Sequence, residues 1–115
     1  MAWFRRHRQA AERRQEDRER LSEVQRHLEE FIRHRSGVEA FVEPATTVTP
    51  PTVLLVAATG EWTRRRIGDR STLDILAQGL NVPVYDVQLV GYPQRMRDWN
   101  ARQKTGEAGG TEESG

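Results

Sequence analysis

The first third of the chain has the pattern of a long and mostly polar helix. Residues 2–35 contain neither Gly nor Pro and are rich in Ala, Arg, Glu, Gln and Leu, which lose little rotamer freedom in a helix. We therefore predict one helix over residues 1–36, ended by Ser36 and Gly37. In its second half, apolar residues recur at spacings of three, four and three and form a stripe on one side. The stripe consists of Leu21, Val24, Leu28 and Phe31.

This apolar stripe can be buried in two ways. Further back along the same seam stand Asp17, Arg14 and Ala10, so the coiled-coil pattern lasts only two heptads. A confident coiled coil needs about three or four heptads, so the pattern favours packing on the protein's own sheet. In the alternative, the stripe contacts a protein partner or a second copy, and the candidate interface is Leu21, Val24, Leu28 and Phe31.

Three runs with strand-like patterns follow the helix. Residues 38–44 (VEAFVEP) alternate and end in Pro, which indicates a short edge strand. Residues 52–58 (TVLLVAA) form the most apolar run of the chain, as expected of a strand that is buried on both faces. After a turn at Thr59 and Gly60, residues 61–67 (EWTRRRI) alternate again, so we expect them to return antiparallel.

The stretch STLDILAQGLNVPVYDVQLV, residues 71–90, allows two interpretations. In the first, a helix begins with a capping-box-like pair, Ser71 and Asp74, ends at Gly79, and is followed by a strand over 82–90. In the second, residues 71–90 form a helix-turn-helix like that of DNA-binding repressors. The many β-branched residues between 82 and 90, and the absence of a cation there, favour the strand.

With the strand interpretation, the elements follow the order helix, strand, strand, strand, helix, strand, helix. The last helix begins near Pro93, with Met96 facing inward. We predict an α+β fold with a small mixed or antiparallel sheet and two short helices. The long charged helix occupies 1–36, the small α+β domain 37–104, and a polar, disordered tail 105–115.

Several kinds of chemistry are absent from the sequence. The chain has no Cys, which excludes disulfides, thiolate metal sites and cysteine nucleophiles. Gly60 stands alone where a dinucleotide-binding turn needs three glycines, and no phosphate-binding loop motif occurs. His27 and His34 are about 10 Å apart along a helix axis, too far for one metal ion. We therefore predict no catalytic residue, no cofactor and no metal site.

Arginine dominates the basic residues, because Lys104 is the one lysine among 18. Two segments, RRRIGDR and GYPQRMRDWN, combine arginines with aromatic residues, as surfaces that hold phosphate and stack on bases do. Ordinary solvated arginines and core aromatics are the alternative explanation. The candidate anion or nucleic-acid surface consists of Arg64, Arg65, Arg66, Arg70, Tyr92, Arg95 and Arg97.

At the N-terminus, Trp3 and Phe4 stand beside three arginines, a composition that allows a weak peripheral contact with an anionic membrane. No apolar run reaches the roughly 18 to 20 residues that span a bilayer, and no secretory signal pattern is present. We expect a cytoplasmic protein.

The stretch PVYDVQLVGYPQRMRDWN resembles the C-terminal part of a family of short proteins from high-GC actinobacteria. The likeness extends over the C-terminal two-thirds of the chain and agrees with its preference for arginine. It implies a cytosolic bacterial origin and carries no activity with it.

These features predict a small, non-enzymatic interaction or adaptor module. It is expected to bind a protein partner, or a second copy, through the N-terminal helix. The alternative is a nucleic-acid-binding protein, which uses either a helix-turn-helix on DNA or the arginine and aromatic surface on RNA.

Overall fold

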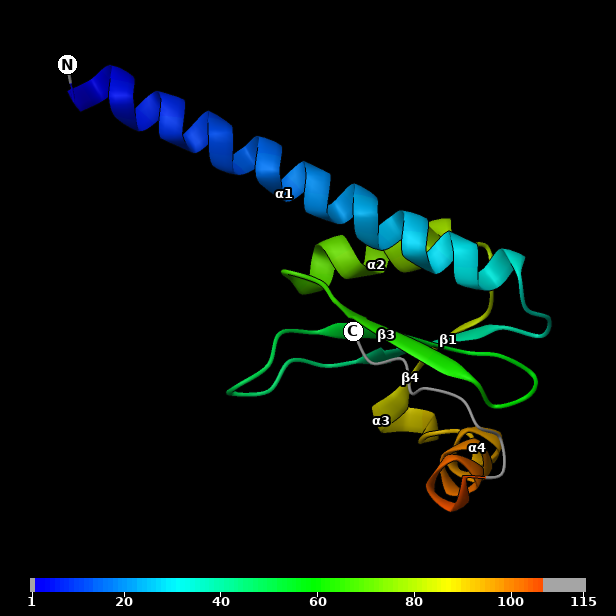
Figure 1. Ribbon diagram of the computed structural model, residues 1–115. Helices are drawn as coiled ribbons and strands as arrows, with labels where there is room; N and C mark the ends of the chain where they lie inside the picture. The colour runs from blue at the N-terminus through cyan, green and yellow to red at the C-terminus, as the bar shows by residue number, and fades with distance from the viewer. Residues whose placement is uncertain (1, 107–115) are drawn as a thin grey trace.

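The computed structural model describes residues 2–106 and consists of a small sheet with helices on both faces (Figure 1). The elements in order are α1 (Ala2–Arg33), β1 (Glu39–Glu43), β2 (Thr52–Val56), β3 (Trp62–Arg66), α2 (Arg70–Gly79), β4 (Val84–Asp86), α3 (Val87–Val90) and α4 (Gln94–Thr105). This order confirms the expected α+β fold, with one extra helical turn, α3. Most of the tail expected at 105–115 lies outside the described residues.

The four strands form one mixed sheet in the order β3, β2, β1, β4. β2 is antiparallel to both β1 and β3, whereas β4 runs parallel to β1 with Tyr85 opposite Phe41. The prediction that residues 38–44 form an edge strand was therefore wrong, because β4 adds to the other side of β1. Pro44 does not conflict with this position, since it follows the last residue of the strand, Glu43.

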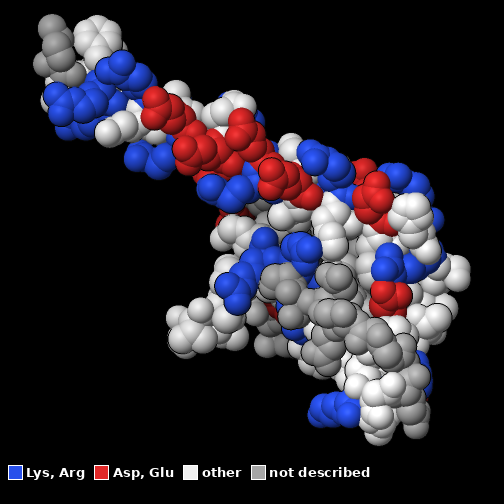
Figure 2. Space-filling model, viewed as in Figure 1, with Lys and Arg blue, Asp and Glu red and all other residues white. Residues whose placement is uncertain are grey.

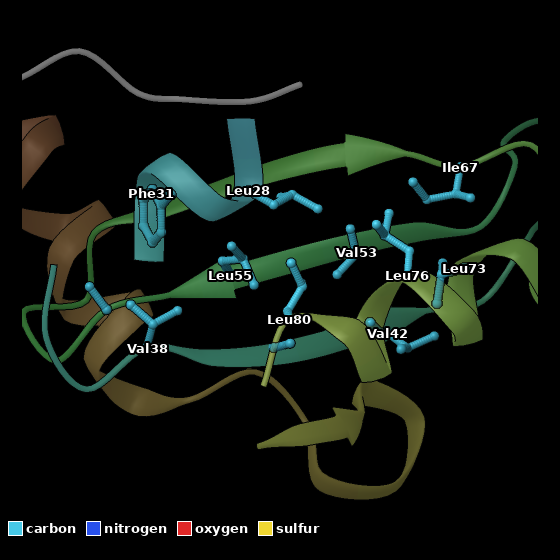
Figure 3. Packing of buried hydrophobic residues seen from close by; sticks show 13 residues of the cluster. Leu28, Phe31, Val38, Val42, Val53, Leu55, Ile67, Leu73, Leu76 and Leu80 are labelled. Carbon is cyan, nitrogen blue, oxygen red and sulfur yellow. The ribbon is translucent and has the colours of Figure 1, made fainter. Parts of the chain in front are cut away.

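Strand β2 is buried along its whole length, as its apolar sequence predicts. On one face of the sheet, Leu28 and Phe31 of α1 and Leu73 of α2 pack over Val53 and Leu55 in a single hydrophobic cluster (Figure 3). On the other face, α4 closes a second, smaller cluster, which contains Phe41, Leu54, Val56, Trp62 and Met96, with Trp99 at its margin. Successive side chains of β2 point to opposite faces of the sheet, so this strand contributes residues to both hydrophobic clusters.

Helix α2 begins and ends differently from the prediction. Its N-cap is Asp69, whose Oδ1 accepts a hydrogen bond of 2.8 Å from the backbone N–H of Thr72, so Ser71 and Asp74 do not form the capping box. The chain turns in the left-handed conformation at Asn81 (φ 60°), whereas Gly79 is the last residue of the helix. Asn adopts this conformation at low cost, which removes the need for a glycine there.

Residues 82–90 form a strand only in part. In the parallel register, Asp86 is opposite Val42, and β1 ends one residue later, before Pro44. The chain beyond Asp86 therefore has no strand to pair with, and it turns into α3 with Asp86 as the N-cap. The strand interpretation is confirmed for Val84–Asp86 and was wrong for the rest. No helix-turn-helix forms over 71–90, since β4 separates α2 from α3.

The turn between β2 and β3 determines how closely α4 can approach the sheet. Gly60 has φ +94°, and a Cβ added to it would lie 2.0 Å from the carbonyl oxygen of Arg95 and 2.9 Å from Cβ of Trp99. Only glycine combines this backbone conformation with so short a distance to the backbone of α4. The second hydrophobic cluster therefore depends on a glycine at this turn.

We predict that Gly60→Ala lowers the free energy of unfolding by at least about 2 kcal/mol, because α4 must shift away from the sheet. Urea unfolding followed by tryptophan fluorescence measures the change. Gly79→Ala is the control, since its Cβ meets nothing within 4 Å and its φ is not positive; it should be neutral or stabilise by up to about 1 kcal/mol. Equal stability of Gly60→Ala and the unmodified protein would contradict the packing of α4 on this turn.

Candidate functional site

The apolar stripe of the N-terminal helix is divided between the core and the surface. Leu28 is 0% exposed and Phe31 3% exposed, and both belong to the hydrophobic cluster under α1. Leu21 and Val24 pack at the margin of the same cluster and remain partly exposed. The chain's own sheet thus covers half of the candidate interface. Leu21 and Val24 are the part that a partner can reach in this fold.

Leu21 and Val24 line a groove where α1 passes beyond the end of the sheet. We call it the elbow groove; its volume is about 490 Å³. One wall comes from α1 and the other from the end of β3 and the start of α2. The lining residues are Asp17, Arg18, Arg20, Leu21, Val24, Arg66, Ile67, Gly68, Asp69 and Thr72. The groove therefore combines an apolar floor with a charged rim.

Beyond the elbow groove, the first part of α1 projects from the domain. This segment, residues 2–20, is called the arm below (Figure 1). At about 1.5 Å per residue it is roughly 28 Å long. Every residue of it except Ala10 is exposed. At its end, Trp3 and Phe4 are 56% and 60% exposed and contact each other edge to face.

Charge is unevenly distributed around the arm. The side of α1 that carries Leu21 and Val24 faces the domain, and a helix repeats its direction about every seven residues. By this phase the domain side of the arm carries Arg6, Arg13, Arg14 and Arg20, with Asp17 as its acid. The outer side carries Glu12 and Glu19 together with Arg5 and Arg8. In Figure 2, acidic side chains lie along the middle part of α1 on the face toward the viewer, and basic ones gather at its tip and on the domain beneath it.

The predicted arginine and aromatic surface is largely occupied by contacts within the chain. Arg64 makes two hydrogen bonds with the carboxylate of Glu43, of 2.6 and 2.9 Å. The hydroxyl groups of Tyr92 and Thr52 donate to the same carboxylate. Glu43 thus joins β1, β2, β3 and the loop before α4. Tyr92 contributes its hydroxyl to this network.

The remaining arginines of that surface also contact the chain, with one exception. Arg95 donates to Glu39 (2.7 Å) and to the carbonyl oxygen of Ala57 (2.9 Å), which ties α4 to the sheet. Arg70 pairs with Asp74, while Arg65 and Arg97 donate to backbone carbonyl groups. The side chain of Arg66 has no hydrogen bond or ion pair with any described residue, and it lines the elbow groove.

Two parts of this arrangement were missed in the sequence. The carboxylates Glu39 and Glu43 lie at the two ends of β1, and each takes an arginine from a distant segment. Alternation places Glu43 on the same face as Phe41, but the partnership with Arg64 depends on the register across β2. The arginines on the domain side of the arm did carry a signal, the seven-residue spacing of Arg6, Arg13 and Arg20.

The network lowers the pKa of Glu43. Burial by itself raises this pKa, but the hydrogen bonds from Arg64, Thr52 and Tyr92 and the charge of Arg64 together outweigh it, so the pKa lies below the ordinary value of 4.5. Burial and the bond to Glu43 raise the pKa of Tyr92 above 10.0. At neutral pH the carboxylate is therefore charged and the phenol is protonated, as the hydrogen bond requires.

We predict that Glu43→Gln lowers the free energy of unfolding at neutral pH by about 1–3 kcal/mol, because Arg64, Thr52 and Tyr92 lose a charged acceptor. Since the pKa of Glu43 is lower in the folded than in the unfolded chain, the stability it contributes is present above pH 4.5 and is lost as the pH falls through the folded pKa. Urea unfolding across this acidic range should show a shallower pH dependence for Glu43→Gln. Glu12→Gln, on the exposed arm, is the control; equal pH dependence of Glu43→Gln and the unmodified protein would contradict the role of the network.

Within the described part of the chain, no group of three or more His, Asp or Glu side chains is placed to hold a metal ion. His27 and His34 have separate partners, Thr63 at 2.7 Å and Glu30 at 3.1 Å. No helix among residues 2–106 combines the length and the apolar character needed to cross a membrane. Comparisons of the chain with protein-family models, with curated proteins and with solved structures found no match.

Proposed function

We propose that the protein is a non-enzymatic binding module that engages a macromolecular partner with its arm and elbow groove. The observation that carries this proposal is the arm, which extends about 28 Å beyond the domain with almost every residue exposed. Helices in proteins gain most of their stability from packing, and the arm buries little surface within the chain. A partner that covers one side of the arm would supply that packing.

The elbow groove supports the same proposal from the side of the domain. It places the partly exposed Leu21 and Val24 beside Ile67, so an inserted apolar group would complete the burial of this floor. The charged rim would fix the orientation of the partner. A protein segment, a second copy of the chain and a nucleic acid are the three partner classes that these features allow. The cysteine-free composition agrees with a reducing, cytoplasmic setting.

We predict that Leu21→Glu reduces partner capture by the immobilised protein at least about tenfold, because a carboxylate on the groove floor opposes apolar burial. Captured material is measured by mass spectrometry before and after nuclease treatment, which separates protein from nucleic-acid partners. Light scattering on the free protein reports a second copy as the partner.

Ile75→Glu is the matched control for this experiment. Ile75 is an apolar residue of α2 that is 73% exposed and lies outside the elbow groove. Its replacement adds the same charge and should leave capture and oligomeric state unchanged. If Leu21→Glu and Ile75→Glu retain the same partners in the same yield, the elbow groove is not the binding site.

A further inference from the structure

We propose that the partner of the arm and elbow groove is the phosphate backbone of a nucleic acid, held on the domain side of the arm. This inference rests on the proposed function and identifies the class of the partner from the distribution of charge on the arm. Of the surface that the sequence suggested it keeps only Arg66, because Arg64 and Arg95 are half-buried and paired with carboxylates inside the chain.

The first support is the row of cations along the arm. Arg6, Arg13 and Arg20 follow one another at seven-residue intervals, which places them on one side of the helix about 10.5 Å apart. Arg14 lies beside them, one heptad before Leu21. The first turn of α1 contains no acidic residue, so the positive end of the helix dipole adds to these charges. Asp17 lies on the same side and pairs with Arg20, so four arginines stand against one carboxylate and the domain side of the arm is a cationic track.

The second support is the convergence of this track with the domain. In the elbow groove, Arg18 and Arg20 of α1 face Arg66 at the end of β3. Of the two carboxylates there, Asp17 pairs with Arg20 and Asp69 caps α2. No ion pair or hydrogen bond holds the guanidinium of Arg66 to a described residue, so this group can contact a phosphate that enters the groove between α1 and β3.

The third support is the difference in charge between the two sides of the arm. By helical phase, Glu12 and Glu19 lie on the outer side, where they offset Arg5 and Arg8 and make that side less attractive to a polyanion than the domain side. A polyanion is therefore directed to the concave side, between the arm and the domain. The exposed ring of Trp3 lies near the end of the same side and can stack on an unpaired base.

The shape of the molecule distinguishes a nucleic acid from a membrane. The domain lies on the same side as the cationic track, so a flat surface would meet the domain before it could contact the length of the arm (Figure 1). A rod or strand fits in the angle between them. Phosphates spaced every few ångströms along a strand also match a row of arginines better than they match a single anion site.

The test is a binding titration of the full-length protein against duplex DNA and single-stranded RNA of mixed sequence, over a range of salt concentrations. Each neutralised phosphate contributes about −0.9 to the slope of log affinity against log salt on duplex DNA, so four or five arginines predict a slope of roughly −4. Vesicles of phosphatidylcholine and phosphatidylserine are titrated in parallel. Binding to either nucleic acid with such a slope, and not to the vesicles, is the expected result.

Two double variants remove the same charge from opposite sides of the arm. Arg13→Gln with Arg14→Gln takes two arginines from the domain side and should weaken nucleic-acid binding at least about tenfold while reducing the slope by about 2. Arg5→Gln with Arg8→Gln takes two from the outer side and should change the affinity less than about twofold. All four residues are exposed, so both variants keep the fold.

Three results would overturn the inference: no nucleic-acid binding at low salt, binding to the vesicles alone, or an equal loss of affinity in the two double variants. The last would indicate a diffuse attraction without a defined face. Nuclease-resistant capture of a protein that Leu21→Glu abolishes, with no nucleic-acid binding, would leave the proposed function standing and reject the polyanion. If Leu21→Glu keeps both protein capture and nucleic-acid binding, the elbow groove is not the site.

Discussion

Burial of strand β2 on both faces is the constraint on which the rest of the structure depends. A five-residue strand with no exposed side chain needs a cover on each face, and three helices supply it. The second half of α1 and α2 cover one face, and α4 covers the other. Each fully buried Leu or Phe contributes about 1.5–3 kcal/mol to the free energy of unfolding. A sheet of this size is therefore stable only when all three helices are in place.

The polar contacts around this core act as ties between segments that are distant in sequence. Glu43 holds Arg64 and Tyr92, and Glu39 holds Arg95, so the two ends of β1 anchor the far edge of the sheet and α4. These arginines are half-buried, and their charges are matched inside the chain. An arginine-rich sequence therefore does not by itself make an arginine-rich binding surface, because position in the fold decides which guanidinium groups remain available.

Only the second half of α1 packs on the hydrophobic core, and the proposed function uses the first half. Leu28 and Phe31 are needed to cover the sheet, whereas Leu21 and Val24 lie at the rim and the arm continues into solvent. The arm and the end of β3 meet at an angle, so arginines from both converge on the elbow groove. The same helix thus stabilises the domain with one half and presents a charged surface with the other.

Most elements of this protein and their inward faces can be predicted from the amino-acid order, because hydrophobic periodicity and turn residues act locally. The sequence predicted the long helix, the turn at Gly60, the inward side of the last helix and a buried strand within 52–58, although that strand ends at Val56 and Ala58 is exposed. Tertiary structure alone decided that β1 is a central strand, that β4 ends at Asp86, and that Arg64 and Arg95 are paired while Arg66 is not. These outcomes depend on strand order and register, which bring together residues up to 56 positions apart. No local pattern encodes such contacts, since each depends on where another segment of the chain lies.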